Sequence, residues 1–420
     1  MRILQVNKYH RVLGGADRVY FQTIDVLRRR GHEVIPFSSR APGEEVVESP
    51  YSSFFVENLA QKLPLRLEDR SRIYLRGIYN LDACRSLEKL IRATKPQVAH
   101  VHNIHYQISP SIFDVLRRYD IPVVMTLHDY RLICPNGYLY TEGAVCERCK
   151  GGRFYNAVLH RCLYNSWAPS VLGATAAYAH AALRIYRAVD RYITHSRFVE
   201  RKMIQFGLAS EKLVYLPVPV KAAAFSSKVS AGEYFLQVGY VVPQKGPQVA
   251  IEAIQRTKGG RLVIVGEGPL VESLGRKVRE GSIQRVSLAG FLSGSKLWDL
   301  FRGSLALVVP SLFHEPLGMV VLEAYALAKA VIASRVGGIP EIVEDGRTGL
   351  LVRPGDIEEL ASAMQALLDH PDRAEEMGRQ ARRLVVRRFS SEAYYDGLMS
   401  LYEDVAVLRQ RRGGNTFGPS

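Results

Sequence analysis

Two glutamates, Glu315 and Glu323, stand in the one pattern of this sequence that most clearly suggests chemistry. The apolar run 305–309 before them predicts a buried parallel strand, and residues 317–329 have the spacing of a packed helix with Pro316 at its first position. A spacing of eight residues is a little over two helical turns, so both carboxylates can face one side, roughly 12 Å apart. The free N–H groups of the helix N-terminus lie between them and favour an anion. The pattern therefore favours a phosphorylated, hydroxyl-rich ligand such as a nucleotide sugar.

Alternating strand and helix patterns must position this pair, and the alternation starts twice along the chain. A polar stretch after Val220 separates the two series, which predicts two Rossmann-like α/β domains facing a cleft, over 1–220 and 221–390. We expect the last helix, 391–410, to cross back to the first domain, and residues 411–420 to form a disordered tail. The predicted strands are 3–6, 32–37, 98–102, 123–129, 192–194, 214–217, 234–239, 261–265, 286–290, 305–309, 331–334 and 349–352.

Two features of the first series also suggest a ligand. The pair Gly14-Gly15 lies between the first strand and a helix over 16–30, where the absence of Cβ atoms lets backbone approach a ligand, although such a pair is also a common turn. His128 ends a predicted strand, and open α/β sheets bind ligands at the carboxyl ends of their strands. A strand-end histidine held by Asp129 is the alternative interpretation.

Composition and charge describe an ordinary globular chain with a basic first half. The 420 residues are 47% hydrophobic and carry a net charge of +15. Residues 1–220 hold 31 Lys and Arg against 19 Asp and Glu, a balance of +12, which favours anionic surroundings such as acidic phospholipid, a lipid phosphate or nucleic acid. A generally basic proteome is the alternative explanation. The N-terminus enters a strand pattern directly and no 18-residue apolar run is found, so we expect a cytoplasmic location, or one on the inner face of the membrane.

A basic stretch with interleaved aromatic residues lies within 40–80. It suits a surface that faces an acceptor or a membrane, and a solvated helix face is the alternative. Its members are Arg66, Arg70, Arg72, Tyr74, Arg76 and Tyr79.

Four cysteines within 134–162 mark an insertion at about 130–165. Their spacing, Cys134-x11-Cys146-x2-Cys149-x12-Cys162, predicts a structural zinc site in a cytoplasmic protein. An iron–sulfur cluster and unligated thiols or disulfides are the alternatives. Four thiolates leave no open coordination position, so a metal here would be structural.

Further motifs in the second half give the chain a family resemblance. Glu315-x7-Glu323 is followed by Gly337-Gly338-Ile339-Pro340-Glu341 and preceded by Lys245-Gly246 and by Gly266-Glu267-Gly268-Pro269. Together with Gly14-Gly15 near the start, this series resembles the retaining glycosyltransferases of family four, also called glycosyltransferases group 1, which have the GT-B fold.

The resemblance implies a role for each matching residue. Glu315 and His128 become the candidate catalytic residues that contact the donor sugar, and Glu323 becomes the carboxylate that binds the ribose hydroxyls. The remaining candidates would hold the sugar and the diphosphate of the donor: Gly14, Gly15, Lys245, Gly266, Pro316, Leu317, Gly318, Met319 and Val320. The family often has an arginine at the position of Tyr240, so part of its diphosphate clamp is absent here or supplied elsewhere.

The expected reaction moves a sugar from a nucleotide diphosphate to a glycan or polyprenyl-linked acceptor, in the synthesis of cell-surface polysaccharide or glycolipid. The resemblance implies no metal or other cofactor for catalysis, because Lys245 and helix amides would stabilise the leaving diphosphate. A GT-B-fold nucleotide-sugar epimerase or phosphorylase is the alternative enzyme. A basic, zinc-containing nucleic-acid-binding protein is the non-enzymatic alternative, although no basic helix follows Cys162 and we expect no nucleic-acid partner.

Overall fold

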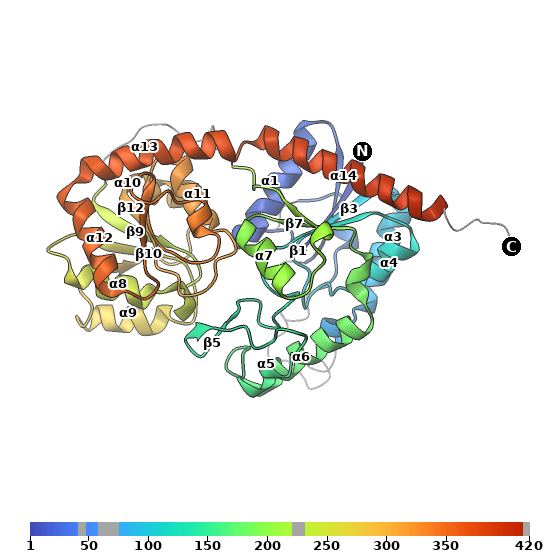
Figure 1. Ribbon diagram of the computed structural model, residues 1–420, viewed down its shortest axis with the longest axis horizontal. Coiled ribbons are helices and arrows are strands. Elements are labelled where there is room, and N and C mark those ends of the chain that lie inside the picture. Colours follow the sequence, from blue (N-terminus) through green and yellow to red (C-terminus); the bar gives the residue numbers. More distant parts are fainter. Residues whose placement is uncertain (41–47, 58–74, 221–231, 415–420) are drawn as a thin grey trace.

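The computed structural model describes residues 1–40, 48–57, 75–220 and 232–414, which form two α/β halves (Figure 1). Each half holds a parallel six-stranded sheet, in the order β2-β1-β3-β4-β7-β8 in the first and β11-β10-β9-β12-β13-β14 in the second. The two Rossmann-like sheets predicted from the sequence are therefore present.

In the first half, runs such as 3–6 form fully buried strands because helices cover both faces of a parallel sheet. Its strands are β1 (Arg2–Tyr9), β2 (Glu33–Ser39), β3 (Val98–Val101), β4 (Val123–Thr126), β7 (Arg191–Thr194) and β8 (Leu213–Tyr215). Its helices are α1 (Gly15–Arg29), α3 (Leu81–Thr94), α4 (Ile112–Arg118), α5 (Asn156–Leu159), α6 (Trp167–Ala182) and α7 (Arg197–Gln205).

The second half repeats the arrangement around β12, whose side chains are all buried. Its strands are β9 (Tyr234–Val238), β10 (Leu262–Val265), β11 (Val286–Leu288), β12 (Ser304–Val309), β13 (Ala330–Ser334) and β14 (Gly349–Val352). Its helices are α8 (Pro247–Arg256), α9 (Val271–Arg279), α10 (Gly294–Gly303), α11 (Met319–Ala326), α12 (Ile357–Asp369) and α13 (Pro371–Arg388).

The last helix, α14 (Ser391–Gly414), leaves the second half after α13 and runs along the first half (Figure 1). Its buried side chains, among them Leu398 and Tyr402, pack with Ile3 and Leu27 of the first half in one apolar cluster. The helix continues through 411–414, where the sequence predicts a disordered tail. Residues 415–420 lie outside the described part of the chain.

The segment between β4 and α6 contains the cysteines and projects below the first half (Figure 1). Its regular structure is a two-stranded antiparallel sheet, β5 (Tyr140–Thr141) with β6 (Ala144–Val145), followed by α5. Most of its backbone therefore depends on turns and on packing for its shape.

Part of the basic aromatic stretch can be placed. Arg66, Arg70, Arg72 and Tyr74 lie outside the described residues. Arg76 forms an ion pair with Asp82, and the Tyr79 hydroxyl donates to Asp114 over 3.1 Å, so both side chains have partners within the first half.

No helix in the described ranges combines the length and the apolar character that crossing a bilayer requires.

Candidate active site

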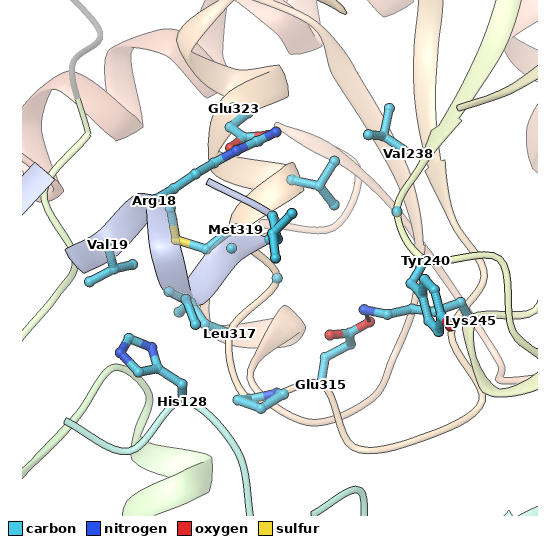
Figure 2. A pocket seen from close by; sticks show the side chains of 18 of the residues that line it. Arg18, Val19, His128, Val238, Tyr240, Lys245, Glu315, Leu317, Met319 and Glu323 are labelled. Carbon is cyan, nitrogen blue, oxygen red and sulfur yellow. Dashed lines mark hydrogen bonds and ion pairs between the residues drawn. The ribbon is translucent and has the colours of Figure 1, made fainter. Parts of the chain in front are cut away.

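A cavity of about 540 Å³ lies between the two halves and collects the residues singled out from the sequence (Figure 2). Its first-half wall comes from the start of α1, the residues after β4 and β7, and α7. Its second-half wall comes from the loops after β9, β10, β11 and β12 and from the start of α11. The predicted residues that line it are Gly14, Gly15, His128, Lys245, Gly266, Glu315, Pro316, Leu317, Gly318, Met319, Val320 and Glu323. Residues more than 300 positions apart in the chain thus share one cavity.

The helix after Glu315 begins later than its sequence pattern indicates. Gly318 has φ +91, a left-handed conformation that a right-handed helix excludes, and α11 therefore starts at Met319. The prediction that Pro316 occupies the first helical position is wrong, and Pro316 and Leu317 lie in the loop. The amides of Met319 and Val320 still belong to the helix N-terminus, and Glu323 lies in its second turn.

Glu315 is held from within the second half. Its Oε1 accepts hydrogen bonds from Ser311 Oγ at 2.7 Å and from Lys245 Nζ at 2.5 Å. The loop is fixed by Gly337, where a Cβ would lie only 2.1 Å from the carbonyl oxygen of Glu315, and by Gly338, whose N–H donates to that oxygen over 2.8 Å. The downstream glycine pair therefore has a positional reason, because only glycine allows this approach.

Glu323 is held from across the cleft. Arg18 of α1 forms an ion pair with its Oε1, and Figure 2 shows this side chain reaching over the cavity. The second oxygen, Oε2, is buried and has no hydrogen-bond partner among the described residues. Burial raises the pKa of Glu323 above its ordinary value, and the positive charge of Arg18 opposes that rise.

His128 turns its ring toward other histidines. Its Nε2 lies 2.9 Å from His102 Nδ1, and the two rings stack at 5.2 Å between centroids. Asp129, the alternative partner, instead accepts from the backbone N–H of Arg131. Burial, together with His195 and His100, holds the pKa of His128 well below its ordinary value, so the ring is neutral.

Close backbone contacts at two glycines join the loop that carries Lys245 to the loops after β10 and β12. Gly246 has φ +66, and a Cβ there would lie 2.0 Å from the carbonyl oxygen of Pro310. A Cβ on Gly266 would lie 1.8 Å from the carbonyl oxygen of Gly239. Tyr240 also lines the cavity and is 58% exposed. The loop carrying Lys245 is thus set by backbone contacts that any side chain at these glycines would break.

Sequence reasoning missed three residues of the site. Arg18 follows Gly15 by three positions, one helical turn, and that spacing was the available signal. Ser311 lies four residues before Glu315 in the same loop. His195 directly follows β7 and lines the cavity, and the sequence gives it no distinguishing neighbour.

The four cysteines line one small cavity in the insertion and are free thiols. Burial and the three neighbouring thiols raise the pKa of Cys149 to about 12. Within the described ranges, no group of three or more His, Cys, Asp or Glu side chains is arranged to hold a metal ion. The cysteines therefore meet as the spacing predicts, but in this structure they do not form a ready metal site.

The insertion also reaches the active-site loop. The Tyr138 ring packs edge-on against Phe313 with centroids 5.7 Å apart, and Glu147 forms an ion pair with Lys202 of α7. The shape of the insertion therefore bears on the loop that carries Glu315.

Two family models match the chain. "Glycosyltransferase Family 4" matches residues 13–223, and "Glycosyl transferases group 1" matches residues 222–384. Between them they cover both halves, including both walls of the cavity.

Individual proteins with similar sequences are also glycosyltransferases. A glycogen synthase of Mycobacterium tuberculosis is 25% identical over 425 residues, covering 96% of this chain and 94% of that protein. An alpha-D-kanosaminyltransferase of Streptomyces kanamyceticus is 33% identical over 177 residues, which is 41% of this chain and 46% of that protein.

Solved structures agree in fold. A sucrose-phosphate synthase from Thermosynechococcus elongatus has a TM-score of 0.71 at 21% identity, covering 97% of this chain and 99% of that one. The Anabaena protein HepE, solved in complex with UDP-glucose, has a TM-score of 0.67 at 17% identity, covering 96% of this chain and all (100%) of that one. Family matches over both halves, with this fold and this cavity, show that the chain belongs to the family-four glycosyltransferases and is a glycosyltransferase of the GT-B fold.

Proposed function

We propose that this enzyme transfers a hexosyl group from a nucleotide diphosphate sugar to a glycan or lipid-linked acceptor, with retention of anomeric configuration. The observation that carries the proposal is the pair of carboxylates at two ends of one cavity, each beside a cation: Glu315 with Lys245, and Glu323 with Arg18. Hydroxyl-rich groups suit the carboxylates and a diphosphate suits the cations. The UDP-glucose complex of HepE supports a donor of this class.

The roles follow from this arrangement. Glu323, with one oxygen lacking a partner, would accept hydrogen bonds from the ribose hydroxyls. Glu315 would accept from hydroxyls of the donor sugar, and His128 would contact the same sugar from the first-half wall. Lys245 and the amides of 317–320 would stabilise the leaving diphosphate as negative charge develops on it.

The proposed chemistry needs no metal. The acceptor oxygen forms a bond to the anomeric carbon on the face from which the phosphate leaves, and the leaving phosphate takes the acceptor proton. Attack by Glu315 as a covalent nucleophile is the alternative route to retention. The charge on the diphosphate would be matched by Lys245, by Arg18 once it releases Glu323, and by backbone amides.

A donor screen followed by product analysis tests the proposal. UDP-, GDP- and ADP-sugars are compared by thermal shift, because a ligand that binds only the folded state raises its stability. The bound donor is then used in a transfer assay, and NMR gives the anomeric configuration of the product. We expect stabilisation by one nucleotide class and a retained configuration, and an inverted product would overturn the mechanism.

The basic first half supports an acceptor at an anionic membrane surface. With +12 over residues 1–220, binding to vesicles with anionic lipid should fall as salt rises. Flotation with anionic and with neutral vesicles, at low and high salt, measures this. Equal flotation with both vesicle types would contradict a surface attraction of this kind.

A structural zinc ion in the insertion also remains a proposal, supported by the four thiols around one cavity. Such an ion would hold the segment that packs on Phe313. Elemental analysis of protein purified without chelator should give one zinc per chain, lost in Cys149→Ser and kept in Cys84→Ser, a thiol in α3 outside that cavity. Wild-type protein that contains no zinc would contradict the proposed zinc site.

A further inference from the structure

A row of hydrogen-bonded side chains crosses the core of the first half from α14 to His128. The Tyr402 hydroxyl lies 2.8 Å from His100 Nδ1 and 3.2 Å from Gln5 Nε2. Gln5 Oε1 lies 3.1 Å from His102 Nε2, and His102 Nδ1 lies 2.9 Å from Nε2 of His128. Gln5 is in β1, His100 is in β3 and His102 directly follows β3, so the row links β1 and β3 to α14.

The inner members of this row are fully buried, which makes their polarity costly. Gln5, His100, His102 and Tyr402 have no exposed surface. Buried polar groups destabilise a fold unless they are hydrogen-bonded, and apolar side chains would fill a sheet core without that requirement. Burial lowers the pKa of His100 to about 3 and that of His102 well below its ordinary value, so the row is neutral. Packing of the sheet core alone does not require the two stacked neutral imidazoles of His100 and His102.

The amide of Gln5 sets the direction of the hydrogen bonds. Its Nε2 donates toward Tyr402, so its Oε1 must accept, and His102 Nε2 carries the proton. A neutral imidazole has one N–H, so His102 Nδ1 accepts, and His128 must donate from its Nε2. At the other end, the Tyr402 hydroxyl donates to His100 Nδ1, and His100 Nε2 donates to Thr126 Oγ1 over 2.7 Å.

We propose that His102, Gln5 and Tyr402 are positioning residues that fix His128 as the Nε2-protonated tautomer and leave its Nδ1 as a hydrogen-bond acceptor for a hydroxyl of the donor. The inference rests on the proposed function of the cavity that His128 lines. It also gives α14 a part in the active site, since the row ends on a side chain that this helix brings back to the first half.

The tautomer can be read directly in the ligand-free protein. Imidazole ¹⁵N NMR of histidine-labelled enzyme, with His128 assigned by its loss in His128→Asn, should show Nε2 protonated and Nδ1 unprotonated at neutral pH. Protonated Nδ1 in the wild-type protein would overturn the proposal, whatever the behaviour of any variant. This readout does not depend on activity.

Variants then test what sets the tautomer. Gln5→Met keeps the volume and removes the amide, so His128 should lose its single tautomer and donor affinity should fall about fivefold to tenfold, the effect of one hydrogen bond. Tyr402→Phe should give a smaller change of the same kind. Tyr394→Phe is the matched control: it also lies on α14 and loses a buried hydrogen bond, to Thr23 over 2.9 Å, but it lies outside the row.

The outcomes separate this proposal from the proposed function. Folded Gln5→Met and Tyr402→Phe enzymes with the wild-type tautomer and wild-type donor affinity would overturn the positioning role. An equal loss in Tyr394→Phe would reduce the effect to general destabilisation of α14 and also overturn it. Absence of any nucleotide-sugar binding by the wild-type enzyme would overturn the proposed function and leave the tautomer result standing.

Discussion

The two ends of the cavity hold their carboxylates in different ways. The Glu315 carboxylate accepts hydrogen bonds from Ser311 and Lys245, both in the second half. Glu323 receives its ion pair from Arg18 in the first half and keeps one buried oxygen without a partner among the described residues. The Glu315 carboxylate is therefore held by one half alone, whereas that of Glu323 gains its partner only when the halves come together.

A donor that binds here must replace the contacts between the two carboxylates and their cations. Both cations already lie against carboxylates, so a diphosphate competes with Glu315 for Lys245 and with Glu323 for Arg18. The sugar and ribose hydroxyls then replace the cations at the carboxylates. If Glu315 faces the reacting sugar and Glu323 the remote ribose, substitutions at the two ends should differ in kind as well as in size.

Glu315→Gln should have the largest effect. Losing the charge next to the developing positive centre should lower kcat by about a hundredfold to a thousandfold, the range seen when one group that stabilises a transition state is removed. Steady-state kinetics with the donor identified by thermal shift measures this. Ser311→Ala, which removes one hydrogen bond to the same oxygen, is the graded control and should lose much less. A rise in KM alone would place Glu315 in ground-state binding.

Glu323→Gln should weaken the donor without slowing the chemistry. Charged hydrogen bonds contribute about 1.5–3 kcal/mol, so the affinity should fall about tenfold or more, with kcat nearly unchanged. Titration calorimetry with the nucleotide diphosphate isolates this end of the cavity, since that ligand has the ribose but lacks the transferred sugar. A kcat loss as large as that of Glu315→Gln would erase the proposed difference between the ends.

Arg18→Met should have the smallest effect at neutral pH, below about fivefold in nucleotide affinity, because freeing Glu323 for the ribose offsets the lost contact between the guanidinium and the diphosphate. The variant should differ from the wild-type enzyme mainly in how its nucleotide affinity depends on pH. The pKa of Glu323 is raised by burial and Arg18 opposes the rise, so removing Arg18 raises that pKa further. Acid protonates the carboxylate and weakens its bonds to ribose, so affinity should start to fall at a higher pH in the variant.

Calorimetry across the acid range, with Glu323→Gln as the pH-insensitive control, measures this shift. Overlapping pH profiles of Arg18→Met and wild-type enzyme would show that the two side chains are not coupled in solution.

Local patterns were enough to predict where the loop that carries Glu315 lies. The run 305–309 is entirely apolar, so its burial as β12 follows from composition, and the loop with Glu315 must then emerge at the carboxyl edge of the sheet. The start of α11 was mispredicted because the apolar spacing of a helix already begins at Leu317. The left-handed backbone of Gly318, which delays the helix to Met319, is not visible in that spacing.

The contacts between distant parts of the chain could not be predicted in the same way. Arg18 and Glu323 are 305 positions apart, and nothing local to either residue indicates the other. His100 and His102 read as ordinary polar residues near a strand end, and the hydrogen-bond partner of His100, Tyr402, belongs to the distant helix α14. Contacts between distant segments are set by how the halves pack, which periodicity does not encode.

The return of α14 has a consequence for the order in which the molecule can be completed during synthesis. Ile3, Tyr20 and Leu27 are translated before the whole second half, yet the apolar cluster that buries them includes Tyr394, Leu398 and Tyr402. Domains usually fold as they emerge, N-terminal first. Here the first half must wait, with part of its apolar surface uncovered, until the whole second half has been translated. The helix thereby makes the maturation of one half conditional on the presence of the other.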